Sequence, residues 1–139
     1  QPDRRARAWH AAMTATPDPA AIEAAVHAYV RALNAGDLDA VVALYADDAS
    51  VEDPVGAAPQ VGRDAIRAFY RRSLSVPLVV ALEGPVRVAG SECAFAFSVS
   101  LTWEGKAMTI RPIDTFRFDG SGRIAQMRAF FGPGNVSAG

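Results

Sequence analysis

The chain has 139 residues, of which 14 are basic, 15 are acidic and 50% are hydrophobic, with a formal net charge of -1. This length predicts a single domain, and so high an apolar content excludes global disorder. The near-zero net charge gives no indication of binding to nucleic acid or to an anionic membrane. No apolar run approaches the roughly 20 residues that span a bilayer. The single cysteine, Cys93, excludes an intrachain disulfide and metal sites built from thiolates.

The first 12 residues differ from the rest of the chain. They contain three arginines and no apolar period, and Met13 follows them. They lack the apolar core of a signal peptide. We interpret residues 1–12 as a disordered segment or an extension, with a basic tail that binds a partner as the alternative, and residues 13–139 as one domain.

Three helices are predicted before residue 75. Asp18 and Pro19 are typical of a helix N-cap and first position, and Gly36 ends this first helix. Asp37 caps a second helix, and a third spans residues 62–74. The apolar stripes of the three helices are Ile22, Val26, Tyr29, Val30 and Leu33; Leu38, Val41, Val42 and Tyr45; and Ile66, Phe69 and Tyr70.

The second half of the chain alternates with period two, as strands do. With an earlier short strand, the expected strands are 49–53, 77–82, 85–90, 93–103, 107–118 and 123–131. The glycine-rich tail from Gly132 is expected to fray. Helices followed by an antiparallel meander indicate an α+β domain. Such a sheet must curl around the helices to bury one face, which makes a cone with a cavity.

Asp114 has an unusual place in the strand predicted at 107–118. Alternation puts it on the apolar face, between Pro112 and Phe116. A charged carboxylate there would cost several kcal/mol, so the group should be neutral or strongly hydrogen-bonded. The alternative is a bulge at the proline that turns Asp114 to solvent.

The side chains of Asp53 and of the tyrosines are predicted to face the same interior space. Asp53 ends the inward row of Ala49 and Val51, although Asp-Pro is also ordinary turn chemistry. The three tyrosines of the chain lie on the apolar helix faces described above. Two carboxyl groups in a dry cavity with pKa values pushed apart form a known acid/base arrangement. We expect no metal site, because His10 lies in the N-terminal segment and His27 on the outer face of its helix.

Several runs resemble the bacterial steroid delta-isomerases (ketosteroid isomerases) of the NTF2-like and SnoaL-like superfamily. The resemblance covers residues 22–131. LYADDA and GRxAIxxFY are shared across the superfamily, whereas the joint presence of Tyr29, Asp53 and Asp114 is specific to the isomerases. The matching runs are Asp37–Pro54, Gly62–Arg63, Phe69–Arg71, Pro112–Asp119 and Gly122–Ile124.

The resemblance implies an NTF2-like cone, in which a curved mixed or antiparallel sheet wraps around three helices. It implies conversion of 3-oxo-delta-5 steroids to 3-oxo-delta-4 steroids without a cofactor. Asp53 matches the general base, while Tyr29 and a protonated Asp114 match the donors to the ketone oxygen. Tyr70 and Tyr45 match the tyrosines that support this phenol through hydrogen bonds.

The same resemblance implies a small apolar ketone as substrate, a cytoplasmic location and a homodimer formed through the sheet. Phe131 replaces a tryptophan of some members, and Pro112 replaces an ordinary strand residue. Two other functions stay open, since a fold does not define a function. They are another NTF2-like enzyme, of polyketide cyclase or epoxide hydrolase type, and a non-catalytic module for ligand binding or dimerisation. The expected substrate-binding residues are Leu33, Phe69, Phe97, Ile110, Met127 and Phe131.

Overall fold

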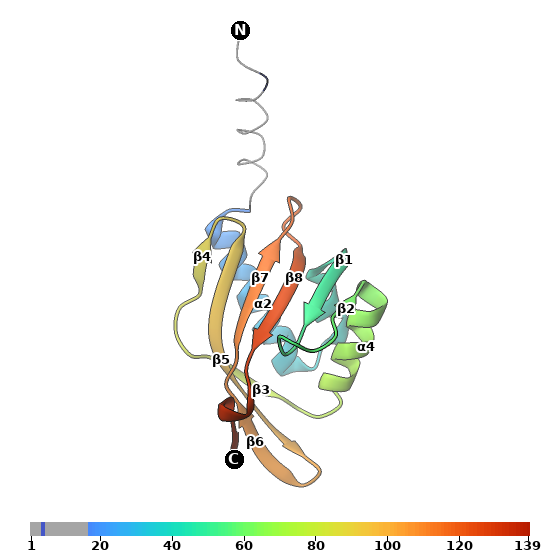
Figure 1. Ribbon diagram of the computed structural model, residues 1–139, viewed down its shortest axis with the longest axis vertical. Helices are drawn as coiled ribbons and strands as arrows, with labels where there is room; N and C mark the ends of the chain where they lie inside the picture. Colours follow the sequence, from blue (N-terminus) through green and yellow to red (C-terminus); the bar gives the residue numbers. More distant parts are fainter. Residues whose placement is uncertain (1–3, 5–16) are drawn as a thin grey trace.

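The computed structural model describes residue 4 and residues 17–139, so the interpretation of residues 1–12 lies almost wholly outside the described chain (Figure 1). Among the described residues, two α-helices come first, a third follows the first two strands, and the remaining strands come after it. The helices are α2 (Pro19–Ala35), α3 (Leu38–Ala43), α4 (Arg63–Ser73) and the 3-10 helix η1 (Pro133–Asn135). The strands are β1 (Tyr45–Glu52), β2 (Gln60–Val61), β3 (Val79–Leu82), β4 (Arg87–Ala89), β5 (Glu92–Trp103), β6 (Lys106–Ile110), β7 (Ile113–Phe118), β8 (Ile124–Phe130) and β9 (Val136–Ala138).

The strands form one mixed sheet in the order β2-β1-β8-β7-β5-β6-β9, and β3 and β4 also pair with β5. β1 and β8 run parallel, and the other pairs are antiparallel. One half of β5 pairs with β4 and β7 and the other half with β3 and β6, so the long strand joins two differently directed parts of the sheet. The helices lie against this curved sheet (Figure 1). The predicted α+β cone is confirmed.

The helix ends follow the predicted capping residues. The Asp18 carboxylate accepts from the Ala20 N–H at 2.8 Å, and Asp37 caps α3 in the same way. Gly36 ends α2 with φ 65°, a left-handed conformation that glycine adopts without steric cost. α4 begins after Gly62, as predicted. These caps fix where each helix presents its apolar face to the sheet.

Tyr45 lies in a strand, and its predicted place on the second helix is wrong. α3 ends at Ala43, and Tyr45 begins β1 opposite Ile124 of β8. The Ile124 N–H donates to the Leu44 carbonyl at 2.8 Å, so pairing with β8 replaces a further helical turn. The strand predicted at residue 49 therefore starts four residues earlier.

The strand predicted at 107–118 is two strands, β6 and β7, separated at Arg111 and Pro112. Proline has no N–H to continue the ladder. The Arg111 N–H instead donates to the Asn135 carbonyl at 2.9 Å, and Phe97 donates to the Pro112 carbonyl. Alternation holds within β7, where Asp114, Phe116 and Phe118 are buried.

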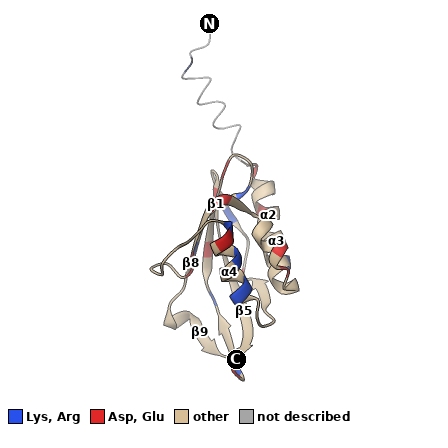
Figure 2. Ribbon diagram, turned by 90° about the vertical axis from the view of Figure 1, so that its right-hand side faces the viewer, with Lys and Arg blue, Asp and Glu red and all other residues tan. Residues whose placement is uncertain are grey.

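The C-terminal tail is a strand, contrary to the predicted fraying. β9 pairs with β6, with Thr109 opposite Ser137, and the Gly139 N–H donates to the Ala107 carbonyl at 2.9 Å. Backbone pairing needs no apolar side chain, which is why composition did not reveal it. β9 carries no charged residue, whereas α4 carries five (Figure 2).

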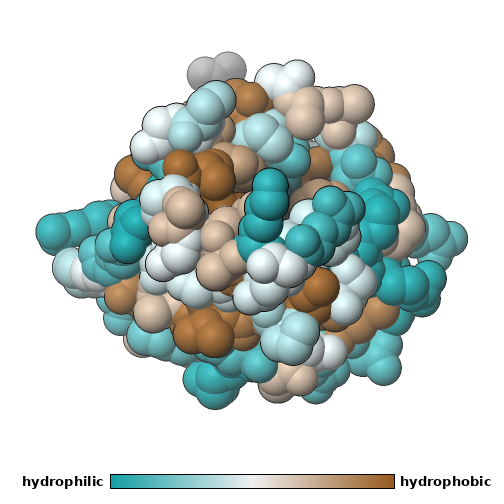
Figure 3. All heavy atoms as spheres, turned by 90° about the horizontal axis from the view of Figure 1, so that it is seen from below, coloured by the Kyte–Doolittle hydropathy of each residue, from teal (hydrophilic) through white to brown (hydrophobic). Residues whose placement is uncertain are grey.

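Buried side chains from the helices and from β1, β5, β7 and β8 form a continuous core. On the surface, apolar residues form small patches separated by hydrophilic side chains in the view from below (Figure 3). None of the described helices is both long and apolar enough to cross a membrane. The large apolar side chains that are exposed are Val61, Val79, Trp103, Ile113, Phe130 and Val136.

Candidate active site

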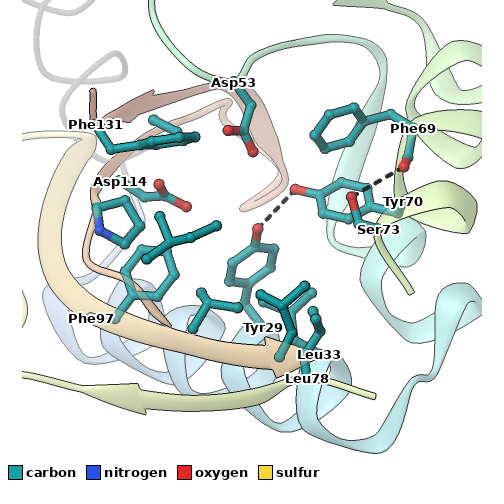
Figure 4. Close-up of a pocket in the computed structure, with 15 residues that line it drawn as sticks. Tyr29, Leu33, Asp53, Phe69, Tyr70, Ser73, Leu78, Phe97, Asp114 and Phe131 are labelled. Atoms are coloured by element: carbon teal, nitrogen blue, oxygen red, sulfur yellow. Dashed lines mark hydrogen bonds between the residues drawn. The ribbon is translucent and has the colours of Figure 1, made fainter. Parts of the chain in front are cut away.

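A cavity of about 260 Å³ opens between the helices and the concave face of the sheet (Figure 4). α2 and α4 form one side of it, and β5, β7 and the ends of β6 and β8 form the other. Its polar residues come from both sides, and the rest of the wall is apolar. The lining residues are Tyr29, Leu33, Asp53, Phe69, Tyr70, Ser73, Leu78, Phe97, Val99, Leu101, Ile110, Pro112, Asp114, Ala129 and Phe131.

Asp114 is buried on the inner face of β7, with 2% of its surface exposed. It pairs with Phe95 on one side and Ala129 on the other, so apolar neighbours flank it. This placement excludes the alternative of a bulge that turns it to solvent. Burial first, and the charge of Asp53 second, raise the pKa of Asp114 well above its usual value. Burial thus favours the protonated form of this carboxyl group, which can donate a hydrogen bond.

The Oδ1 atom of Asp114 has no hydrogen-bond partner among the described residues. Buried polar atoms almost always have one. The carboxyl group points into the cavity, toward the space between Asp53 and the Tyr29 hydroxyl (Figure 4). A ligand oxygen placed there would supply the missing partner.

Asp53 follows the last residue of β1 and faces the same space from the opposite side (Figure 4). Burial raises the pKa of Asp53 to about 6, which still leaves it mainly ionised at neutral pH. The two acids thus differ: burial favours the protonated form of Asp114, whereas a pKa of about 6 lets Asp53 accept a proton at neutral pH. Such a separation is the usual mark of an acid and a base in one site.

Three tyrosine hydroxyls form a buried chain that leads from the cavity wall into the core. The Tyr29 hydroxyl lies 2.9 Å from that of Tyr70, which lies 2.5 Å from that of Tyr45. Burial raises the pKa of all three phenols well above its usual value. The hydrogen bond with Tyr70 acts in the opposite direction on Tyr29 and lowers its pKa. Tyr29 is therefore a neutral donor whose developing negative charge Tyr70 would stabilise.

Aromatic contacts hold the Tyr29 ring in place. Its ring packs edge-to-face on Phe116 at 5.1 Å between centroids, and less closely on Phe95 and Tyr70. Edge-to-face pairs stabilise one orientation of both rings. The hydroxyl is thereby directed at the cavity before any ligand enters.

The structure brings Tyr29, Asp53, Asp114 and Tyr70 to one cavity, and Tyr45 supports them from outside its wall. Met127 was expected to bind the substrate, but it is fully buried in the core and does not line the cavity. It lies between Val51 and Phe116 in the sheet, two residues before Ala129, which does reach the wall. The other expected substrate-binding residues, Leu33, Phe69, Phe97, Ile110 and Phe131, all line the cavity.

Sequence reasoning missed part of the wall. Val99 and Leu101 continue the inward row of β5, so alternation could have found them. Ser73 follows Phe69 by one helical turn, which also is a readable signal. Leu78 lies in the irregular segment before β3, and no pattern marks it.

Among the described residues, no group of three or more His, Cys, Asp or Glu side chains could hold a metal ion. The side chains of the cavity supply one carboxyl group with a pKa of about 6, a second whose protonated form is favoured by burial, and one phenol. Together they can remove a proton from a carbon acid while two donors stabilise the resulting oxyanion.

Comparison with known proteins identifies the family. The model of the SnoaL-like domain matches residues 26–127. This chain belongs to the SnoaL-like family. A curated relative, a Steroid Delta-isomerase of Nocardioides simplex, is 39% identical over 117 residues, covering 84% of this chain and 94% of the relative. This match confirms the resemblance to steroid delta-isomerases.

A solved structure also resembles this SnoaL-like chain. It is that of SalBIII, described as an epoxide hydrolase/cyclase-like enzyme with a role in pyran ring formation in the polyether salinomycin. The two have a TM-score of 0.83 and 26% sequence identity, over 88% of this chain and 98% of that one. Enzymes of different chemistry thus share this cone, so the reaction must be argued from the side chains in the cavity.

Proposed function

We propose that this protein isomerises 3-oxo-delta-5 steroids to the conjugated 3-oxo-delta-4 steroids by intramolecular proton transfer. The observation that carries the proposal is the pair of carboxyl groups, Asp53 and Asp114, that share one apolar cavity with the Tyr29 hydroxyl. The similarity to a curated Steroid Delta-isomerase supports it. The apolar wall suits a flat polycyclic ketone with little polar surface.

The reaction begins at the carbon between the ketone and the double bond. The Asp53 carboxylate removes a proton from this carbon, and the electron pair passes into the carbonyl to give a dienolate. The Tyr29 hydroxyl and the protonated Asp114 donate to the dienolate oxygen. Asp53 then returns the same proton two carbons farther along, which moves the double bond into conjugation. No atom is gained or lost, and each donor is already oriented when the negative charge develops.

The direct test is an absorbance assay with 5-androstene-3,17-dione. Formation of the conjugated enone raises ultraviolet absorbance, and 4-androstene-3,17-dione should be the sole product. In heavy water, the proton returned by Asp53 should be largely the one removed. Absence of turnover, with the phenolic steroid equilenin still bound, would show a ligand-binding module in place of an isomerase.

A second candidate function is opening of an epoxide, which the same acid pair favours. Protonated Asp114 could donate to the epoxide oxygen while Asp53 activates a nucleophilic hydroxyl. The structural similarity to SalBIII supports this alternative. The two reactions are distinguished by offering a steroid ketone and a hydroxy-epoxide to the same preparation, because only the isomerase forms an enone.

The homodimer implied by the family would use the outer face of the sheet. Ile113 of β7 and Phe130 of β8 lie opposite each other there, and both are exposed. Arg128, next to this pair, is engaged by Glu52 at 2.8 Å and lies over the Phe130 ring. Apolar side chains with a polar surround are typical of such interfaces.

The pH dependence of kcat/KM should report the ionisation of Asp53. A general base acts in its ionised form, so kcat/KM should rise with pH up to about 6, the raised pKa of Asp53, and be level above it. Stopped-flow assays across pH 4–9 would measure the profile. An inflection near the ordinary aspartate value would contradict the burial of this group.

Tyr29→Phe should lower kcat by roughly 10²–10³-fold, the usual effect of losing one oxyanion donor. KM should change little, since the aromatic ring and its packing on Phe116 are kept. Tyr45→Phe removes the far hydroxyl of the same chain and should lower kcat less than Tyr29→Phe does, because this hydroxyl does not reach the cavity. Equal activity of Tyr29→Phe and the unaltered protein would restrict this tyrosine to filling the core.

A further inference from the structure

The side-chain amide of Asn34 takes the place of a missing strand beside β3. Its Nδ2 donates to the Val80 carbonyl at 2.9 Å, and its Oδ1 accepts from the Val80 N–H at 2.7 Å. β3 pairs only with β5 among the described strands, so its other edge would otherwise leave these two backbone groups without a protein partner. One side chain thus joins the last turn of α2 to the free edge of β3.

The two segments that Asn34 joins both contribute to the cavity wall. Leu33 precedes Asn34 on α2, and Leu78 lies two residues before Val80, and both line the cavity. In Figure 4 the two leucines lie on the far side of the Tyr29 ring from Asp114. They therefore bound the part of the cavity that is remote from the acids. A ligand whose oxygen lies between Asp114 and Tyr29 reaches them only if it is longer than one ring.

The segment that carries Leu78 has few other anchors. It follows the end of α4 at Ser73, contains Pro77, which has no N–H, and becomes a strand only at Val79. Val79 is 67% exposed, so its side chain contributes little packing. Val80 is buried and Leu78 packs against the core, so the position of Leu78 depends on this packing, on the pairing of β3 with β5, and on Asn34 at the free edge of β3.

We propose that Asn34 is a positioning residue that holds the wall at Leu78 against α2, and so sets the preference of the cavity for ligands of several rings. This rests on the proposed function for the nature of the ligand. Asn34 does not touch the reacting atoms, and the chemistry at Asp53, Tyr29 and Asp114 does not depend on it. An effect on length preference, with the chemical step unchanged, separates this role from a contribution to stability alone.

The test compares a long and a short ligand that present the same phenol group. Equilenin, with four rings, and phenol, with one, would be titrated by fluorescence and by displacement of equilenin. Asn34→Leu removes both hydrogen bonds at similar volume and should raise the Kd of equilenin roughly tenfold, equivalent to about 1.4 kcal/mol. The Kd of phenol should change less than about twofold, because phenol does not reach Leu78. Arg31→Leu, three residues earlier on the exposed side of α2, should change neither.

Asn34→Asp gives a second, milder variant in case the leucine variant fails to fold. It keeps the acceptor for the Val80 N–H and loses the donor to the carbonyl, so its effect on equilenin should lie between those of the unaltered protein and Asn34→Leu. Equal loss of affinity for both ligands, or no loss for either, would overturn the proposal. Because binding is measured, the outcome does not require turnover. A protein that binds equilenin with this pattern but forms no enone would refute the isomerase and leave the role of Asn34 standing.

Discussion

Asp53→Asn is expected to lower kcat by roughly 10²–10⁴-fold, the contribution of a positioned general base. An amide cannot take the proton from the carbon acid, yet it has the size of the carboxyl group it replaces. The cavity should keep its shape, so equilenin should bind with an affinity similar to that of the unaltered protein. Turnover of 5-androstene-3,17-dione and equilenin fluorescence would measure the two properties separately.

Asp48→Asn is the matched control for this change. It makes the same chemical substitution five residues earlier, at an exposed position of β1. Its activity should equal that of the unaltered protein. Near-normal turnover in Asp53→Asn would remove this carboxylate from the mechanism and leave the cavity without an ionised base.

Substitutions of Asp114 should separate its role as a donor from its burial. Asp114→Asn keeps an N–H donor at the same place and should lose less than about tenfold in kcat. Asp114→Ala removes the donor, so its kcat should fall by roughly 10²–10³-fold. Steady-state assays of the pair, with thermal unfolding as a check on folding, would measure the difference. Equal activities would show that Asp114 does not donate to the substrate.

The stability of these variants should depend on pH in a direction opposite to that of most aspartates. The pKa of Asp114 is raised in the folded protein, so the folded state keeps a proton that the unfolded chain releases above its own pKa of about 3.9. The free energy of unfolding of the unaltered protein therefore falls as pH rises from about 4 toward the folded pKa. Asp114→Asn lacks this contribution, so its stability relative to the unaltered protein should increase by up to about 1.4 kcal/mol per pH unit over that interval. Urea unfolding at several pH values would measure it, and a constant difference would contradict a raised pKa.

Alternation placed Asp114 on the inner face of the sheet correctly, because β7 follows the period of two strictly. A carboxyl group between apolar positions is recognisable from the sequence, and Asp114 is buried where the pattern places it. The helix ends at Asp18, Asp37 and Gly36 were equally readable, since each of these residues acts within one turn of its own helix. Local rules therefore predicted the helices and the inner faces of the strands well.

Contacts between distant segments were beyond these rules. Tyr45 continues an apolar helical stripe, yet pairing with Ile124, 79 positions later, makes it a strand residue. β9 exists because β6 offers it a free edge. Met127 shares its face with Ala129, and only the depth of the cavity, a property of the whole cone, decides which of the two reaches the wall. The depth of a cavity cannot be predicted from the pattern of a single sequence.

The tyrosine chain has a direction as well as a geometry. Each hydroxyl carries one proton, so the two bonds can run from Tyr45 to Tyr70 to Tyr29 or the reverse. In the reverse order the proton of Tyr45 would need another acceptor, and the hydrogen bonds of the described residues include none besides Tyr70. The forward order leaves the proton of Tyr29 facing the cavity. Tyr45, the phenol farthest from the cavity, thus sets the direction of the hydrogen bonds. Because of this direction, Tyr29 presents a proton to a ligand and not a lone pair, so the site selects ligands that carry a hydrogen-bond acceptor.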